Sequence, residues 1–270
     1  MQNAPTSVIV KELEELFARD KMVERWIKIY IGILILGILT FFAGVVFGDL
    51  VGGSAQNLIP IGIVIFIFSI VQLVRYNRKN LEDRKLLTGL RLARIIGVDL
   101  KKNTPLQIAI SFENYLKHGR ALKGNSQWGK FFDTWFQAHG RLADNTVFDI
   151  SVSQKVTRKE RRKRKYTKVK EAIQEIVSLQ LKPVGEDFPK LDQFPQVIRQ
   201  QQQEAGRKML PFDISRAEVR NGTVRLAAVT AHYMKTSGRS NQETGKENLI
   251  DGDRLLMLLL ATYAALHRCK

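Results

Sequence analysis

The sequence predicts a membrane protein: an N-terminal two-helix transmembrane hairpin, then a basic cytoplasmic domain of mostly α (α+β) class with a small β-hairpin. Three observations lead to this fold class. Residues 29–74 contain a single charged side chain, Asp49. The net charge is +17, and the residues after 76 carry all of it, with 37 basic and 20 acidic side chains. Asn221-Gly222 lies between two short alternating runs, the pattern of a two-residue hairpin turn.

The uncharged runs predict two membrane-spanning helices, at about 29–48 and about 58–76. An α-helix needs about 20 apolar residues to cross a bilayer core of about 30 Å. Gly52, Gly53 and Ser54 indicate a turn between the spans. Pro60 then falls in the first turn of the second helix, where its missing N–H costs nothing. A hairpin buried inside a soluble protein is the alternative, which the polar remainder of the chain disfavours.

The flanking charges predict the orientation of this hairpin, because Lys and Arg stay on the cytoplasmic side. Lys21, Arg25 and Lys28 precede the first span, a basic group follows the second, and residues 49–57 hold neither Lys nor Arg. We therefore expect a bacterial-type inner (plasma) membrane with both termini cytoplasmic. The expected membrane-interface residues are Trp26, Tyr30, Arg75 and Tyr76.

A cleaved signal peptide is the competing interpretation of the first run, because Gly53-Ser54-Ala55 resembles a small-residue cleavage site. The five acidic residues within 1–28 and the second apolar run that follows argue against it.

Small residues in the first span predict close packing of transmembrane helices. The expected packing positions are Gly32, Gly37, Gly44 and Gly48. No ionisable residue lies inside either span, and such residues mark proton and ion pathways. This argues against a transporter, although an oligomeric pore lined by backbone or by hydroxyl groups stays open.

Composition and periodicity predict the other boundaries. Residues 1–28 form an amphipathic cytoplasmic helix, and residues 77–182 form a basic helical cytoplasmic region. Residues 183–212 form a Pro/Gln-rich linker with a short helix near 196–206. Residues 213–270 form an α+β segment with an apolar terminal helix from about Asp253, whose carboxylate is the expected cap.

Three segments of the basic region carry more specific expectations. Thr104-Pro105 predicts a helix start, with a helix to about 117. Aromatic residues at three- and four-residue steps predict a helix over 126–140, for which we favour core packing over a membrane interface. Alternation over 146–152 predicts a strand.

A run of cations is the main candidate binding site. Apolar residues at helical spacing follow it up to Leu181, so we expect the cations to form the exposed first turns of a helix. Like charges at i,i+4 and at a helix N-terminus destabilise such a helix, and a docked anion relieves both effects. The expected polyanion-binding residues are Arg158, Lys159, Arg161, Arg162, Lys163, Arg164, Lys165, Lys168 and Lys170.

The alternatives for this run are a solvated arm and a membrane-surface segment. The expected partners are the membrane and one polyanion: nucleic acid, an acidic protein segment or anionic lipid. We also expect an oligomer or a larger complex. No base-specific recognition motif is present.

No motif indicates catalysis, a cofactor or a metal site. The segment from Gly238 to Lys246 resembles a phosphate-binding loop, but it has six residues between its glycines where four are required. One cysteine, Cys269, excludes an intramolecular disulfide. The sequence therefore favours a non-enzymatic, membrane-anchored polyanion-binding protein within a membrane assembly such as a DNA-transfer or secretion machine. The alternatives are an oligomeric pore-forming effector and a membrane-tethered enzyme.

Overall fold

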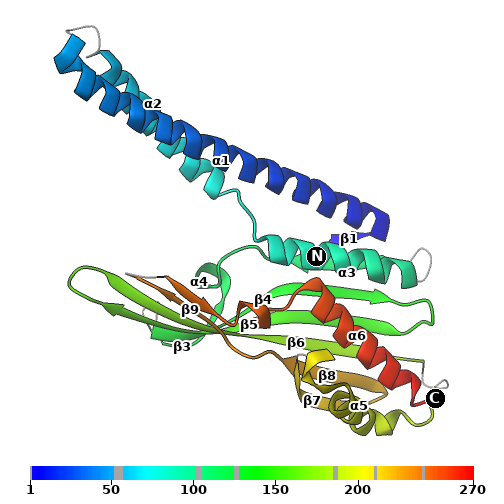
Figure 1. Ribbon diagram of the computed structural model, residues 1–270. Helices are drawn as coiled ribbons and strands as arrows, with labels where there is room; N and C mark the ends of the chain where they lie inside the picture. Colours follow the sequence, from blue (N-terminus) through cyan, green and yellow to red (C-terminus); the bar gives the residue numbers. More distant parts are fainter. Residues whose placement is uncertain are drawn as a thin grey trace. The chain divides into compact units, whose positions relative to one another are not determined.

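The computed structural model describes residues 2–51, 57–100, 105–124, 128–184, 188–209, 212–238 and 241–270 (Figure 1). The chain divides into two compact units. We call Glu14–Glu82 the hairpin unit. We call the combination of Met1–Leu13 and Asp83–Lys270 the sheet unit.

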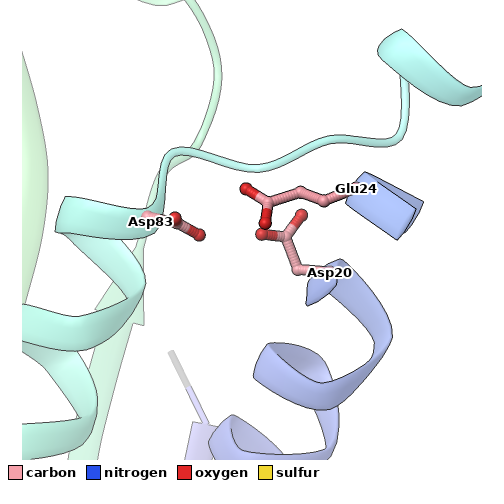
Figure 2. Close-up of side chains that lie close together, drawn as sticks. All are labelled: Asp20, Glu24 and Asp83. Carbon is pink, nitrogen blue, oxygen red and sulfur yellow. The ribbon is translucent and has the colours of Figure 1, made fainter. Parts of the chain in front are cut away.

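Two helices form the hairpin unit: α1 (Thr6–Val51), whose first residues belong to the sheet unit, and α2 (Leu58–Asn77). Both are long and apolar enough to cross a membrane, as predicted. Only 11% of the most apolar window of each helix is buried, whereas a core helix of a soluble protein is mostly buried. At the polar end of α1, Asp20 and Glu24 lie one turn apart (Figure 2), and Asp20 Oδ1 accepts a hydrogen bond from the Leu81 N–H at 2.7 Å.

The first residues of the chain are part of the sheet unit. Strand β1 (Gln2–Ala4) pairs antiparallel with β2 (Leu106–Ile110), and the sequence did not predict it. The first turns of α1 bury Ile9 and Leu13. Residues 2–13, which precede the first apolar run, are therefore part of the same unit as the residues that follow the second apolar run.

A large antiparallel sheet, not a small hairpin, dominates the sheet unit. Its main path runs β1-β2-β4-β5-β6-β8-β7, with β3 on β4, β9 on β6 and β10 on β9. The remaining strands are β3 (Arg120–Gly124), β4 (Trp128–Arg141), β5 (Val147–Arg162), β6 (Thr167–Lys182), β7 (Asp213–Arg220), β8 (Thr223–Val229), β9 (Tyr233–Ser237) and β10 (Gln242–Thr244).

The three long strands β4, β5 and β6 form a meander whose two halves have different surroundings. In the half that ends at Arg141, Val147 and Lys182, helices cover one face. These are α3 (Asp83–Asp99) and α6 (Gly252–His267), with α5 (Phe194–Met209) against α6 and β7. In the other half, the ends of β5 and β6 extend past these helices (Figure 1). Short helical segments complete the unit: α4 (Tyr115–His118), η3 (Leu191–Gln193) and η4 (Lys246–Asn248).

The helix predicted over 126–140 is wrong, because this segment is strand β4. A β-bulge between Thr134 and Phe136 explains the misleading pattern. The bulge adds one residue to the strand, so that Trp135 and Phe136 are both buried. Aromatic residues before and after the bulge then recur at spacings that imitate a helical face. The expected core packing is confirmed for Phe131, Trp135 and Phe136, which are buried, but not for Trp128, which is 44% exposed.

The helix predicted from the basic run to Leu181 is also wrong, since the segment is the β5–β6 hairpin. Val169, Ile173, Val177 and Leu181 are four residues apart, a step that keeps side chains on one face of either a helix or a strand. The β-branched residues were the available signal for a strand.

Three further predictions need correction. The helix expected over 104–117 is replaced by β2 and the short α4, and Thr104 lies outside the described residues. The expected linker contains the full helix α5. Asp251, not Asp253, caps α6 by accepting the Arg254 N–H at 2.9 Å.

Candidate polyanion-binding face

The basic run forms the closed end of the β5–β6 hairpin. Its turn consists of Lys163, Arg164, Lys165 and Tyr166, and the Lys163 N–H donates to the Tyr166 carbonyl at 2.8 Å. All three basic turn residues are exposed. The other predicted cations lie on β5 and β6, where directly paired residues share one face of the sheet.

The strand register sorts these cations onto two faces. Lys159 pairs with Lys170, and Arg161 pairs with Lys168, so these four side chains share one face. Arg158 pairs with Glu171 on the opposite face. Arg162 alternates onto that opposite face as well, opposite Thr167. The sequence could not reveal this separation without the register.

The face that holds Arg158 is compensated in charge. Arg158 lies 2.9 Å from Glu160 and 3.2 Å from Glu171. The Tyr115 hydroxyl donates to Glu171, and burial together with this hydrogen bond raises the pKa of Tyr115. Below these groups Tyr115 packs with Phe131 and Val156 in an apolar cluster. This arrangement is structural, because each charge has a partner within the fold.

We call the other side the basic face, defined by Trp128, Lys159, Arg161, Lys168 and Lys170. Trp128 pairs with Lys159 across β4 and β5, so its ring stands in the row of Lys159 and Lys170. Within the described residues, none of these four cations forms an ion pair.

The basic face contains an open depression. Five cations and the Trp128 ring line it, and its one carboxylate, Glu160, is paired with Arg158. Lys130 and Lys155, both exposed, continue the same face along β4 and β5. The depression therefore has a positive field, because its five cations face one carboxylate that is already paired with Arg158.

The like-charge rows work against folding. Two cations directly opposite each other on neighbouring strands are destabilising. The compensated face shows that this hairpin accommodates carboxylates where they stabilise it, since Glu171 occupies the position opposite Arg158. The unpaired rows are thus a local cost that an external anion would remove.

A buried polar network fixes the helices on the opposite face of the sheet. Glu175 is fully buried, and both of its carboxylate oxygens accept from Arg84 Nη1 at 2.9 Å. Trp135 Nε1 donates to Glu175 at 3.2 Å, and the Ile250 N–H donates at 2.5 Å. Because Arg84 lies on α3 and Ile250 precedes α6, one carboxylate ties both helices to β6. No local sequence pattern indicates this network.

The predicted packing glycines have different surroundings in the hairpin unit. A Cβ at Gly37 would lie 3.0 Å from Ile65, and one at Gly44 would lie 2.8 Å from Ile59, so both face α2 closely. Gly32 has no atom within 4 Å of that position. The side-chain environment of Gly48 lies outside the described residues. A Cβ at Gly62 on α2, a position that was not predicted, would lie 2.6 Å from the Phe41 nitrogen, closer than a Cβ at Gly37 or Gly44 would lie to α2.

The predicted interface aromatics gather at one end of the hairpin. Ring centroids are 6.0 Å apart for Trp26 and Tyr30, 6.2 Å for Trp26 and Tyr76, and 5.4 Å for Tyr30 and Tyr76. Arg75 is exposed beside them in sequence. An aromatic group next to a cation is typical of a membrane–water interface.

Comparison of the chain with protein-family models, with curated proteins and with solved structures gave no match. Function therefore has to be argued from the residues of the site.

Proposed function

We propose that this chain is a membrane-anchored, non-enzymatic interaction protein whose basic face binds nucleic acid or another polyanion. The observation that carries the proposal is the pair of like-charge rows, Lys159 with Lys170 and Arg161 with Lys168. These rows lack counterions among the described residues, while the reverse side of the same hairpin is compensated. Contacts of this kind recognise phosphate charge and not base sequence.

The anchor in this proposal is the hairpin unit. Its support is the length and apolar composition of α1 and α2, their exposed apolar side chains, and the aromatic cluster of Trp26, Tyr30 and Tyr76. Both termini would then face the cytoplasm, with the sheet unit on that side. A basic domain held at an inner membrane suits a multi-protein assembly that transfers DNA or secretes protein.

Binding of an oligonucleotide by the full-length protein at a series of salt concentrations tests the proposal. The full chain is required, because residues 2–13 belong to the sheet unit and a fragment beginning at 77 would lack them. In the test variant, Lys159, Arg161, Lys168 and Lys170 are changed to Gln. We expect weaker binding and a flatter dependence of log affinity on log salt, since fewer counterions are released.

The matched control removes four equally charged, exposed side chains elsewhere in the sheet unit. Its changes to Gln are at Arg141, Lys182, Lys190 and Arg220. If charge on the basic face matters, this control keeps nearly the original slope. If both variants lose affinity equally, the protein responds to net charge alone and the proposed face is incorrect.

A further inference from the structure

The closed end of the β5–β6 hairpin continues beyond the strands that flank it. Toward the turn, β4 pairs with β5 only as far as Lys159, and β9 pairs with β6 only as far as Val169. From there to the turn, β5 and β6 pair only with each other within the described part of the chain. We call this two-stranded segment, residues 160–169, the ribbon tip. It also extends past the helices that cover the sheet (Figure 1).

One side of the ribbon tip belongs to the basic face. Arg161 and Lys168 lie directly opposite each other on that side, and Lys163 lines the same depression. The ribbon tip contains one carboxylate, Glu160, which lies 2.9 Å from Arg158. An anion bound to this side therefore meets cations that no free carboxylate of the ribbon tip neutralises.

Three further cations of the ribbon tip lie outside the lining of that depression. Arg162 alternates onto the reverse face of the hairpin, and Arg164 and Lys165 are exposed at the turn. Among the residues that the structure describes, none of these three forms an ion pair. A ligand that contacts only the basic face would leave all three charges unmatched. The ribbon tip therefore presents positive charge in more than one direction.

A nucleic-acid duplex is the ligand that carries anionic charge on two opposing sides of one space. Its two phosphate backbones border each groove, so an element inside a groove meets phosphates on both sides. A bilayer presents one charged plane, and a single strand presents one backbone. Cations on both faces and at the turn thus favour a duplex over a lipid surface or a single strand.

The dimensions of the ribbon tip suit the major groove of B-form DNA. Two β-strands lie about 4.8 Å apart, and this groove, about 12 Å wide, admits a two-stranded β-ribbon. Three residue pairs precede the turn, and at about 3.3 Å per residue they extend about 10 Å. The free length of the ribbon therefore matches the depth of the groove, about 8.5 Å. The major groove of A-form RNA is too narrow for side chains to enter.

We propose that the ribbon tip enters the major groove of double-stranded DNA. The basic face contacts one phosphate backbone, and Arg162, Arg164 and Lys165 contact the opposite one. This inference rests on the proposed polyanion-binding function and names its ligand class. It also assigns a role to three cations that a single strand lying on the basic face does not need.

The test measures the affinity of the full-length protein, in phosphatidylcholine nanodiscs, at a series of salt concentrations. The probes are a DNA duplex, one of its strands alone, and an RNA duplex of the same sequence and length. The strand is chosen without self-complementarity, so that it stays single. Binding of phosphatidylglycerol vesicles is measured in parallel, to test anionic lipid as the ligand.

The tip variant changes Arg162, Arg164 and Lys165 to Gln. A second variant changes the two arginines to Lys, which keeps their charge and shows whether the turn tolerates substitution. The matched control removes three equally charged, exposed side chains elsewhere in the sheet unit. Its changes to Gln are at Arg141, Lys182 and Lys190.

We expect the tip variant to flatten the slope of log affinity against log salt for the DNA duplex. Each lost phosphate contact accounts for about 0.9, so the slope should flatten by about 3 if each side chain contacts one phosphate. The slopes for the single strand and for the RNA duplex should change little, because neither ligand surrounds the ribbon tip. The Lys variant and the control should keep nearly the original slope for the DNA duplex.

Three results would overturn the inference. One is an unchanged slope of the tip variant for the DNA duplex. Another is an equal flattening for the DNA duplex and for either the single strand or the RNA duplex, which would indicate added charge without a groove. The third is loss of vesicle binding by the tip variant while its duplex binding is unchanged, which would assign the ribbon tip to lipid.

The four-residue Gln variant of the basic face separates this inference from the proposed function. If that variant loses salt-dependent binding of the single strand while the tip variant gives one of these three results, only the role of the ribbon tip is wrong. If that variant binds both the single strand and the duplex normally, the proposed polyanion-binding function is wrong as well.

Discussion

Replacing Glu175 with Gln tests whether one buried carboxylate holds α3 and α6 on the sheet. Glu175 is completely buried, and its partner Arg84 has a side chain that is 21% exposed. Glutamine keeps the shape of the side chain but removes its charge. Its NH₂ group is a hydrogen-bond donor, and it replaces a carboxylate oxygen that accepts from a neighbouring donor. Removing one member of a buried ion pair typically costs about 3–5 kcal/mol, because the other charge stays buried without its partner.

The structure predicts that this cost is not confined to one ion pair. The Glu175 carboxylate also accepts from Trp135 Nε1 and from the Ile250 N–H, and Arg84 Nη1 donates to the Ile250 carbonyl at 2.7 Å. Each buried polar group left unsatisfied costs about 1–3 kcal/mol. The double substitution of Arg84 and Glu175 by Leu therefore remains destabilising, because both backbone groups of Ile250 lose their partners.

Chemical denaturation of the full-length protein in mild detergent measures these costs. The matched control is Glu218→Gln, which breaks the exposed pair of Glu218 with Arg216 at 2.8 Å. Exposed pairs of this kind contribute at most about 1 kcal/mol. Glu175 does not hold the two helices if Glu175→Gln lowers the free energy of unfolding no more than Glu218→Gln does, or if the double Leu variant is as stable as the unmodified chain.

Three further substitutions test other parts of the structure, each followed through the unfolding midpoint in detergent. Ile9→Ala should destabilise the fold by about 2–5 kcal/mol, because the Ile9 side chain is only 3% exposed. The control is Val8→Ala, since Val8 is 43% exposed. Equal effects of the two substitutions would contradict the packing of the N-terminal residues in the sheet unit. Gly62→Val should destabilise by about 1–3 kcal/mol through a backbone clash, while Gly32→Val should be tolerated; the reverse order would exclude this helix contact. Lys170→Glu should stabilise the fold by about 0.2–1 kcal/mol, by creating an opposite-charge pair across the hairpin, and should weaken oligonucleotide binding; a loss of stability would contradict the strand register.

Elements were predicted correctly where the local sequence pattern fits only one kind of secondary structure. Asn221-Gly222 forms the expected tight turn between β7 and β8, with φ of 50° and 67° at the two residues. These left-handed angles match a type I′ turn, for which Asn-Gly is the preferred pair. The two long apolar helices were predictable for the same reason.

The rest depended on long-range pairing that local patterns do not encode. Residues four apart share a face in a helix and in a strand, so Val169, Ile173 and Val177 fitted both. The basic run was recognised as a charge cluster, and its exposure was expected. Its division into a compensated face and a basic face follows from pairing Arg158 with Glu171 and Lys159 with Lys170. Trp128 could join the site only once β4 was placed beside β5.

The central claim is that four cations on one face of the β5–β6 hairpin bind a polyanion, and the slope of log affinity against log salt tests it most directly. For a single strand each lost phosphate contact flattens this slope by about 0.7, so the four Gln substitutions should flatten it by about 3 if each side chain contacts one phosphate. The control variant with Gln at Arg141, Lys182, Lys190 and Arg220 should keep nearly the original slope. A basic-face variant whose slope matches that of the unmodified protein would contradict the account.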